Sequence, residues 1–130
     1  MQFMYDKTLI IDILDQIIEA IEIVQERCKF AKKEDDFIDT KEGQEKLDSI
    51  CMKLIAVGES LKKIDHITNK ILLSKYPKID WRNIKGIRDF ISHHYFDLDA
   101  SIIFDICQEN IDELLKVLKI IKKDLKAQIR

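Results

Sequence analysis

Residues that interrupt helices are almost absent from this chain. Among 130 residues there are only three glycines and one proline, so few tight turns are possible and a sheet of many strands is disfavoured. Apolar residues instead recur at three- and four-residue steps, the spacing of one face of an α-helix. The sequence therefore predicts a single all-α domain over residues 1–130, folded as an antiparallel up-and-down bundle.

About four long helices and one short helix are expected. Polar residues that can accept a hydrogen bond from the first helical turn precede three of them, and these predicted N-caps are Asp6, Thr40 or Asp39, and Asp80. Gly58 lies inside the second helix, where glycine costs roughly 1 kcal/mol relative to alanine. Either the helix simply tolerates it or, as we favour, it allows another helix to pack closely against it. The predicted helices span residues 6–32, 40–64, 66–74, 81–95 and 99–126.

Charge is unevenly distributed along the chain. The whole sequence carries a formal net charge of -2, which excludes a generally basic nucleic-acid binder. Residues 1–50 hold 7 basic and 13 acidic side chains, whereas residues 53–88 hold 9 basic and 3 acidic ones, a net charge of +6. This second segment is either a solvated, lysine-rich face or a local surface that attracts anions.

The cysteines and the hydropathy of the sequence indicate whether the protein works in a reducing compartment and whether it enters a membrane. Cys28, Cys51 and Cys107 are odd in number and include no C-x-x-C pair, so a zinc site has little support and buried free thiols in a reducing cytoplasm are expected. Acidic residues interrupt the apolar N-terminal stretch every few positions, whereas a membrane span needs about 20 apolar residues. We therefore expect a cytoplasmic protein with no signal peptide and no membrane association.

An unusual polar octet, RDFISHHY at residues 88–95, lies in the fourth predicted helix. On an ideal helix Arg88 and His93 point about 140° apart and lie about 7.5 Å apart along the axis. Two arrangements could bring them together, and they can coexist: the helix ends near Ser92, or a second copy of the chain supplies the partner groups. Phe90 adds an apolar group away from the core-facing stripe, as the face of a homodimer would.

Arginine and histidine together suit phosphodiester chemistry. A guanidinium binds two phosphate oxygens at once, and an imidazole can move a proton to or from a ribose 2′-hydroxyl or a leaving oxygen. No metal is required if the nucleophile is the 2′-hydroxyl of the substrate, and the sequence offers no acidic cluster suited to Mg²⁺. We predict no metal and no cofactor. On spacing alone, Arg88, His93 and His94 are also compatible with a surface cluster at a helix end, and Tyr95 with the rim of the core.

The octet has the pattern R-x4-H-x-Y, with Arg88, His93 and Tyr95 in the fixed positions. The segment VGES at 57–60 and the ordered Pro77, Trp81 and Gly86 within YPKIDWRNIKGIRDFISHHYFDLD at 76–99 accompany it. Together they resemble the HEPN superfamily, specifically the HepT-like toxins of HEPN–minimal nucleotidyltransferase toxin–antitoxin modules. The resemblance covers residues 36–118. One departure is Asp89, where these toxins more often carry Asn and the wider superfamily also uses Asp.

The resemblance implies a homodimeric bundle of the HEPN type in which two R-x4-H motifs face one cleft and cut RNA without metal, leaving a 2′,3′-cyclic phosphate. Arg88 would hold and neutralise the scissile phosphate, His93 would transfer a proton, and Asp89 would support them. A cognate nucleotidyltransferase antitoxin would silence the toxin by transferring AMP to Tyr95. Two other interpretations remain: a non-catalytic HEPN-fold module that only binds a nucleotidyltransferase, and a structural helical dimer.

Overall fold

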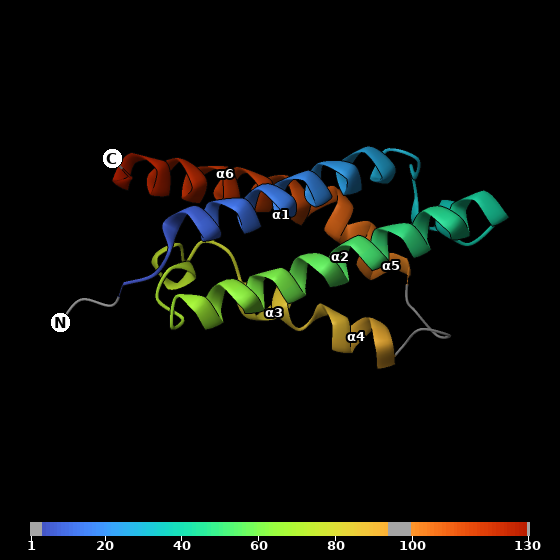
Figure 1. Ribbon diagram of the computed structural model, residues 1–130. Helices are drawn as coiled ribbons and strands as arrows, with labels where there is room; N and C mark the ends of the chain where they lie inside the picture. The colour runs from blue at the N-terminus through green and yellow to red at the C-terminus, as the bar shows by residue number, and fades with distance from the viewer. Residues whose placement is uncertain (1–3, 94–99, 130) are drawn as a thin grey trace.

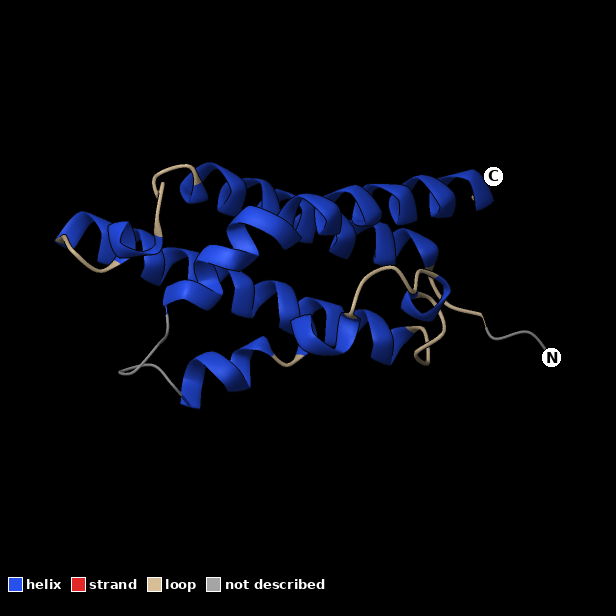
Figure 2. Ribbon diagram, turned by 180° about the vertical axis from the view of Figure 1, so that it is seen from behind, coloured by secondary structure: helices blue, strands red, loops and turns tan. Residues whose placement is uncertain are grey.

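The computed structural model describes residues 4–93 and 100–129, and in these ranges the chain forms helices and loops with no strand (Figure 2). The predicted all-α fold is confirmed. The α-helices are α1 (Lys7–Cys28), α2 (Lys41–Ile67), α3 (Trp81–Lys85), α4 (Ile87–His93), α5 (Ala100–Asp105) and α6 (Ile111–Gln128). Two 3-10 turns, Glu34–Phe37 and Leu73–Lys75, and a π-helical segment, Ile106–Asn110, complete the described structure.

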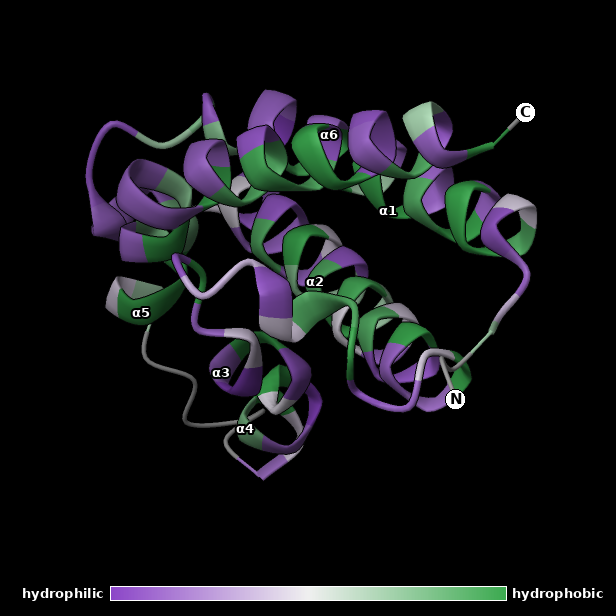
Figure 3. Cartoon of the chain, turned by 90° about the vertical axis from the view of Figure 1, so that its left-hand side faces the viewer, coloured by the Kyte–Doolittle hydropathy of each residue, from purple (hydrophilic) through white to green (hydrophobic). Residues whose placement is uncertain are grey.

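Helix α2 lies between two layers of helices. On one side it packs against α1, which packs in turn against α6; on the other side it contacts α3 and α4 (Figures 1 and 3). The chain direction reverses between α1 and α2 and again between α1 and α6, as the predicted antiparallel bundle requires (Figure 1). The core is filled by fully buried aliphatic side chains from α1, α2 and α6, among them Ile10, Ile17, Ile50, Leu61 and Leu118.

All three predicted N-caps are present. The side chain of Asp6 accepts a hydrogen bond from the backbone amide of Leu9 at 3.1 Å. The hydroxyl of Thr40 accepts one from Gly43 at 3.0 Å, and the carboxylate of Asp80 accepts one from Asn83 at 3.3 Å. Each satisfies a backbone N–H that has no partner inside its helix. The starts of α1, α2 and α3 were therefore readable from the sequence.

The predicted short helix at 66–74 is wrong. Helix α2 continues to Ile67, and the chain then leaves the helix through Asn69 and Lys70, whose φ angles are 53° and 61°. In this left-handed turn the amide of Lys70 donates to the carbonyl of Asp65 at 2.7 Å. Two consecutive residues with left-handed φ angles cannot continue a right-handed helix, so the helix stops there. Before Pro77 the chain forms only one 3-10 turn, Leu73–Lys75, in which Leu73 is buried.

The fourth predicted helix starts where expected but is broken at Gly86, so that α3 ends at Lys85 and α4 begins at Ile87. The prediction that Gly58 allows close packing is confirmed. A Cβ atom at Gly58 would lie 2.7 Å from the carbonyl oxygen of Ile84 and 3.2 Å from Cγ2 of Ile87. Only a glycine lets the backbone of α3 approach α2 this closely.

The expectation of three free thiols is wrong. Cys28, at the end of α1, and Cys107, in the π-helical segment before α6, form a disulfide with their Cα atoms 5.6 Å apart. They are 79 residues apart in sequence, so only the antiparallel packing of α1 and α6 brings them together. Cys51 is free and buried, and this burial, with the nearby charge of Asp48, raises the pKa of its thiol to about 11.

In the part of the chain that the structure describes, no helix is both long enough and apolar enough to span a membrane.

Candidate active site

Arg88 lies on α4 beside the middle of α2, where a carboxylate holds it. Its Nη1 atom donates to Oε1 of Glu59 at 2.6 Å, while the other carboxylate oxygen of Glu59 is 3.2 Å from the ammonium group of Lys62. The hydrogen bond from Arg88, followed by that from Lys62, lowers the pKa of Glu59. The guanidinium is thus oriented by α2, yet its side chain is 58% exposed, which leaves donors free for an anionic ligand.

His93 is the last residue of α4, and its side chain is exposed. The described part of α4 ends at His93, one residue after Ser92, and His93 is itself helical, so a helix end near Ser92 does not turn His93 toward Arg88. Five residues of helix separate the directions of Arg88 and His93 by about 140°. One chain alone therefore presents the two groups on different sides of α4.

Of the other residues predicted for the site or the dimer face, the structure describes Asp89 and Phe90. Asp89 is exposed and lines a groove beside α3. His94 and Tyr95 lie outside the described residues, so the role of Tyr95 as an AMP acceptor stays a prediction. Phe90, expected on a dimer face, is partly buried and packs against the core of its own chain. Dimerisation likewise stays a prediction.

The groove beside Asp89 runs between the C-terminal end of α2 and α3. It has a volume of about 400 Å³, and most of the side chains that line it are charged. Its lining residues are Lys62, Asp65, His66, Lys70, Arg82, Lys85, Gly86 and Asp89. The basic segment 53–88 supplies nearly all of these charges, and its role as an anion-attracting surface stays a prediction.

Sequence reasoning missed Glu59, although its segment, VGES, was part of the family resemblance. No local pattern singled it out, because the residue after Gly58 points about 100° away from it on the helix and its contact with Arg88 spans 29 positions. Among residues 4–93 and 100–129 no three His, Cys, Asp or Glu side chains are grouped so that they could hold a metal ion.

Comparison with known proteins places the chain in a family. The model of the family described as "Ribonuclease HepT-like" matches residues 11–121. A Methanocaldococcus jannaschii protein named "Putative RNase" is 25% identical over 122 residues, which cover 94% of this chain and 91% of that protein. A "Probable ribonuclease HepT" from Thermococcus cleftensis is 29% identical over 103 residues, covering 79% of this chain and 86% of that protein.

A third relative, a "Putative RNase" from Caldanaerobacter subterraneus, is 30% identical over 106 residues and covers 82% of this chain and 88% of its own length. No solved structure matches. The family match spans all six α-helices in part or whole and includes the exposed Arg88 and His93 of α4. The chain therefore belongs to the ribonuclease HepT-like family.

Proposed function

We propose that this protein is a ribonuclease toxin that cleaves RNA without metal, using Arg88 and His93 at a cleft between two copies of the chain. The observation that carries the proposal is how α4 presents its two polar side chains. Glu59 holds Arg88, whose side chain is more than half exposed, and His93, five residues later, is also exposed. A fixed guanidinium and an accessible imidazole are the two groups that phosphodiester cleavage needs.

In the proposed reaction the guanidinium of Arg88 binds the non-bridging oxygens of the scissile phosphate. The 2′-oxygen of the same nucleotide forms a bond to phosphorus and loses its proton, and the bond from phosphorus to the 5′-oxygen breaks as that oxygen gains a proton. His93 takes part in this proton transfer. The products are a 2′,3′-cyclic phosphate and a 5′-hydroxyl. The nucleophile belongs to the substrate, so the proposal includes no metal and no cofactor.

The test is RNA cleavage by the purified protein in the presence of EDTA. Arg88→Ala and His93→Ala should each slow cleavage by roughly 10²–10³-fold, the usual loss when one group that stabilises the transition state is removed. His94→Ala is the control and should have a smaller effect. Circular dichroism should show unchanged helicity for all three variants. Cleavage by His93→Ala at the wild-type rate would show that the proton-transfer role is wrong.

The proposed cleft contains two chains because one chain points Arg88 and His93 in different directions. We expect sedimentation to show a homodimer at micromolar concentration. Mixing the inactive Arg88→Ala and His93→Ala proteins should restore part of the activity, since a mixed dimer still holds one intact Arg88 and one intact His93. A protein that remains monomeric while it cuts RNA contradicts the shared cleft.

The proposed partner is a minimal nucleotidyltransferase antitoxin that transfers AMP to Tyr95. An added phosphate would attract Arg88 and would compete with RNA for the same space. Co-expression with the cognate enzyme should raise the intact mass by one or more AMP units. Tyr95→Phe should cut RNA but resist silencing. If Tyr95→Phe still gains AMP and loses activity, the modification lies elsewhere.

A second candidate function is a non-catalytic HEPN-fold module that only binds the nucleotidyltransferase. Asp89 is the observation that favours it, because a negative charge next to Arg88 opposes the binding of a phosphate. A chain that binds the partner enzyme and cuts no RNA, while Asp89→Asn cuts it, would support this alternative.

A further inference from the structure

We propose that the groove between the end of α2 and α3 holds phosphates of the RNA strand next to the one that is cut. The inference rests on the proposed ribonuclease function and adds a substrate-binding surface outside the R-x4-H motif. The groove residues that would contact the strand are Lys62, Lys70 and Arg82, with His66 beside them. Four features of the structure support the proposal.

The first feature is the balance of charge in the groove. Four cationic side chains face two carboxylates there, a formal net charge of +2. Lys85 pairs with Asp65, which is only 7% exposed, so these two charges neutralise each other and fix α3 on α2. Among the residues that the structure describes, Lys70 and Arg82 have no carboxylate within ion-pair distance. Both are exposed and remain available to an anion.

The second feature is the backbone of Lys70. Its φ of 61° lies in the left-handed region, where the Cβ of most residues meets the backbone and glycine is favoured. The turn would be less strained with glycine at this position, yet the chain has a lysine whose side chain lines the groove. Asn69, the residue before it with a φ of 53°, is of a type that tolerates this conformation. A lysine in such a position is consistent with a role in binding.

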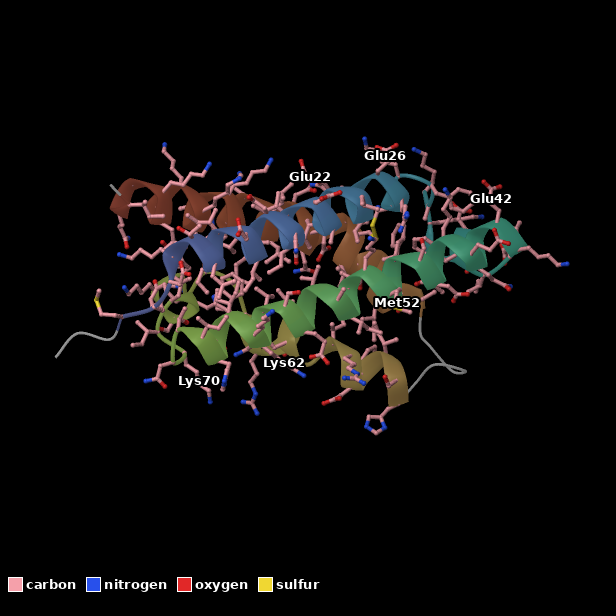
Figure 4. The ribbon with its side chains drawn as sticks, in the orientation of Figure 1. Glu22, Glu26, Glu42, Met52, Lys62 and Lys70 are labelled. Carbon is pink, nitrogen blue, oxygen red and sulfur yellow. A yellow bond between two sulfur atoms is a disulfide. The ribbon has the colours of Figure 1, made fainter. Side chains whose placement is uncertain are left out.

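The third feature is continuity with the proposed cleavage site. The carboxylate of Glu59 contacts Arg88 through one oxygen and Lys62 through the other. From Lys62 the basic side chains continue along one face of α2 to His66, four residues or about 6 Å further along the axis, and then to Lys70. Figure 4 shows Lys62 and Lys70 on the same side of α2, the side that carries α3 and α4. A strand bound at Arg88 can therefore extend along this face.

The fourth feature is the kind of contact that the groove offers. No tryptophan, tyrosine or phenylalanine lines it within the described residues, so it provides no platform on which a base could stack. Ammonium and guanidinium groups bind phosphate oxygens without regard to sequence. The groove should therefore bind the backbone of a single strand and contribute affinity, without selecting the cut site.

The experiment measures how salt weakens the binding of a labelled single-stranded RNA to full-length His93→Ala protein, which is used so that the RNA stays intact. For single strands the slope of log K against log salt changes by about 0.7 for each phosphate contact. Arg82→Ala and Lys70→Gly, each added to His93→Ala, should both reduce the slope by about that amount. Lys70→Gly should keep or raise the melting temperature, because glycine relieves the left-handed turn.

The matched control is Lys123→Ala in the same background, which removes one exposed positive charge from α6, on the far side of the bundle from α3 (Figure 3). Its slope should equal that of the parent. In the presence of His93, Arg82→Ala should raise KM several-fold and leave kcat within about two-fold, since the contacts do not touch the reacting atoms.

Slopes that are unchanged in Arg82→Ala and Lys70→Gly would overturn the inference, as would a parent protein that binds no RNA. If AMP binds and Arg82→Ala weakens only that binding, the groove is a nucleotide site and the inference is also wrong. The proposed function is judged separately by cleavage. If the protein cuts RNA but the slopes are unchanged, only the groove proposal is wrong. If the slopes change but no RNA is cut, only the catalytic proposal is wrong.

Discussion

The two sides of α2 are stabilised in different ways. On one side α1 and α6, helices of 22 and 18 residues, bury aliphatic side chains along their whole length and are linked through the Cys28–Cys107 disulfide near the end of α1. On the other side α3 and α4 have only 5 and 7 residues, and each buries a single side chain, Trp81 or Ile91. Every described residue of the proposed RNA surface lies on α2 or on this second side.

The difference in length matters because an isolated helix shorter than about 12 residues is marginal in water. Helices α3 and α4 are therefore positioned by individual contacts with α2: the close approach at Gly58, the pair between Lys85 and Asp65, and the pair between Arg88 and Glu59. We expect changes in the α1–α6 layer to alter stability and changes beside α3 and α4 to alter activity.

The largest expected change in stability comes from removing the disulfide. The double substitution Cys28→Ser with Cys107→Ser should lower the free energy of unfolding by about 2–4 kcal/mol, because the bridge closes a long loop and restricts the unfolded chain. Urea denaturation measures this loss, and RNA cleavage at low temperature should stay at the wild-type rate. A reducing agent should destabilise the wild type and leave the double variant unchanged.

Loss of cleavage in a double variant that remains folded would break the comparison, since it would mean that the α1–α6 layer also shapes the site.

The next largest change is expected at Gly58. Gly58→Ala would place a Cβ 2.7 Å from the carbonyl oxygen of Ile84, a backbone atom that cannot turn away as a side chain could. The resulting shift of α3 and α4 should cost about 1–3 kcal/mol of stability. Because Arg88 moves with α4, RNA cleavage should fall even in conditions where the variant is fully folded. Urea denaturation and cleavage assays on the same preparation measure both effects.

Gly86→Ala is the matched control. Its backbone φ of -86° suits any residue, and a Cβ there would lie 3.3 Å from the carbonyl oxygen of Arg82. We expect its stability to stay within about 1 kcal/mol of the wild type. If Gly86→Ala proved as damaging as Gly58→Ala, the close approach at Gly58 would not be what positions α3 and α4.

The same contrast between local and long-range contacts explains what could be read from the sequence. The helices, their caps at Asp6, Thr40 and Asp80, and the close packing at Gly58 follow from patterns within a few residues. The Cys28–Cys107 disulfide and the contact between Glu59 and Arg88 join residues 79 and 29 positions apart. No local pattern specifies such pairs. The predicted helix at 66–74 was wrong because Asn69 and Lys70 take left-handed φ angles just after the end of α2.

The smallest expected effect tests whether the two sides are independent. Tyr76, in the segment that leads to α3, donates its hydroxyl to the carboxylate of Asp124 on α6 at 2.6 Å. Its backbone carbonyl accepts the indole N–H of Trp81 at 2.9 Å. Tyr76 is thus a direct link between α6 and the start of α3. Tyr76→Phe should lower the free energy of unfolding by about 1 kcal/mol, the usual contribution of one hydrogen bond.

The stability that the hydrogen bond between Tyr76 and Asp124 contributes also depends on pH. Burial, and then the hydrogen bond to Asp124, raise the pKa of Tyr76 to about 12, above its usual value of about 10. The folded state therefore retains the proton where the unfolded state loses it. The stabilisation is complete below about pH 10 and is lost as the pH rises toward 12. Denaturation curves across this range should show a decrease in stability for the wild type that is smaller in Tyr76→Phe.

RNA cleavage by Tyr76→Phe tests whether the two sides of α2 act independently. If Tyr76→Phe also slowed RNA cleavage, α6 would help to position α3. The contrast between a layer that stabilises the protein and a layer that acts on RNA would then not hold at Tyr76.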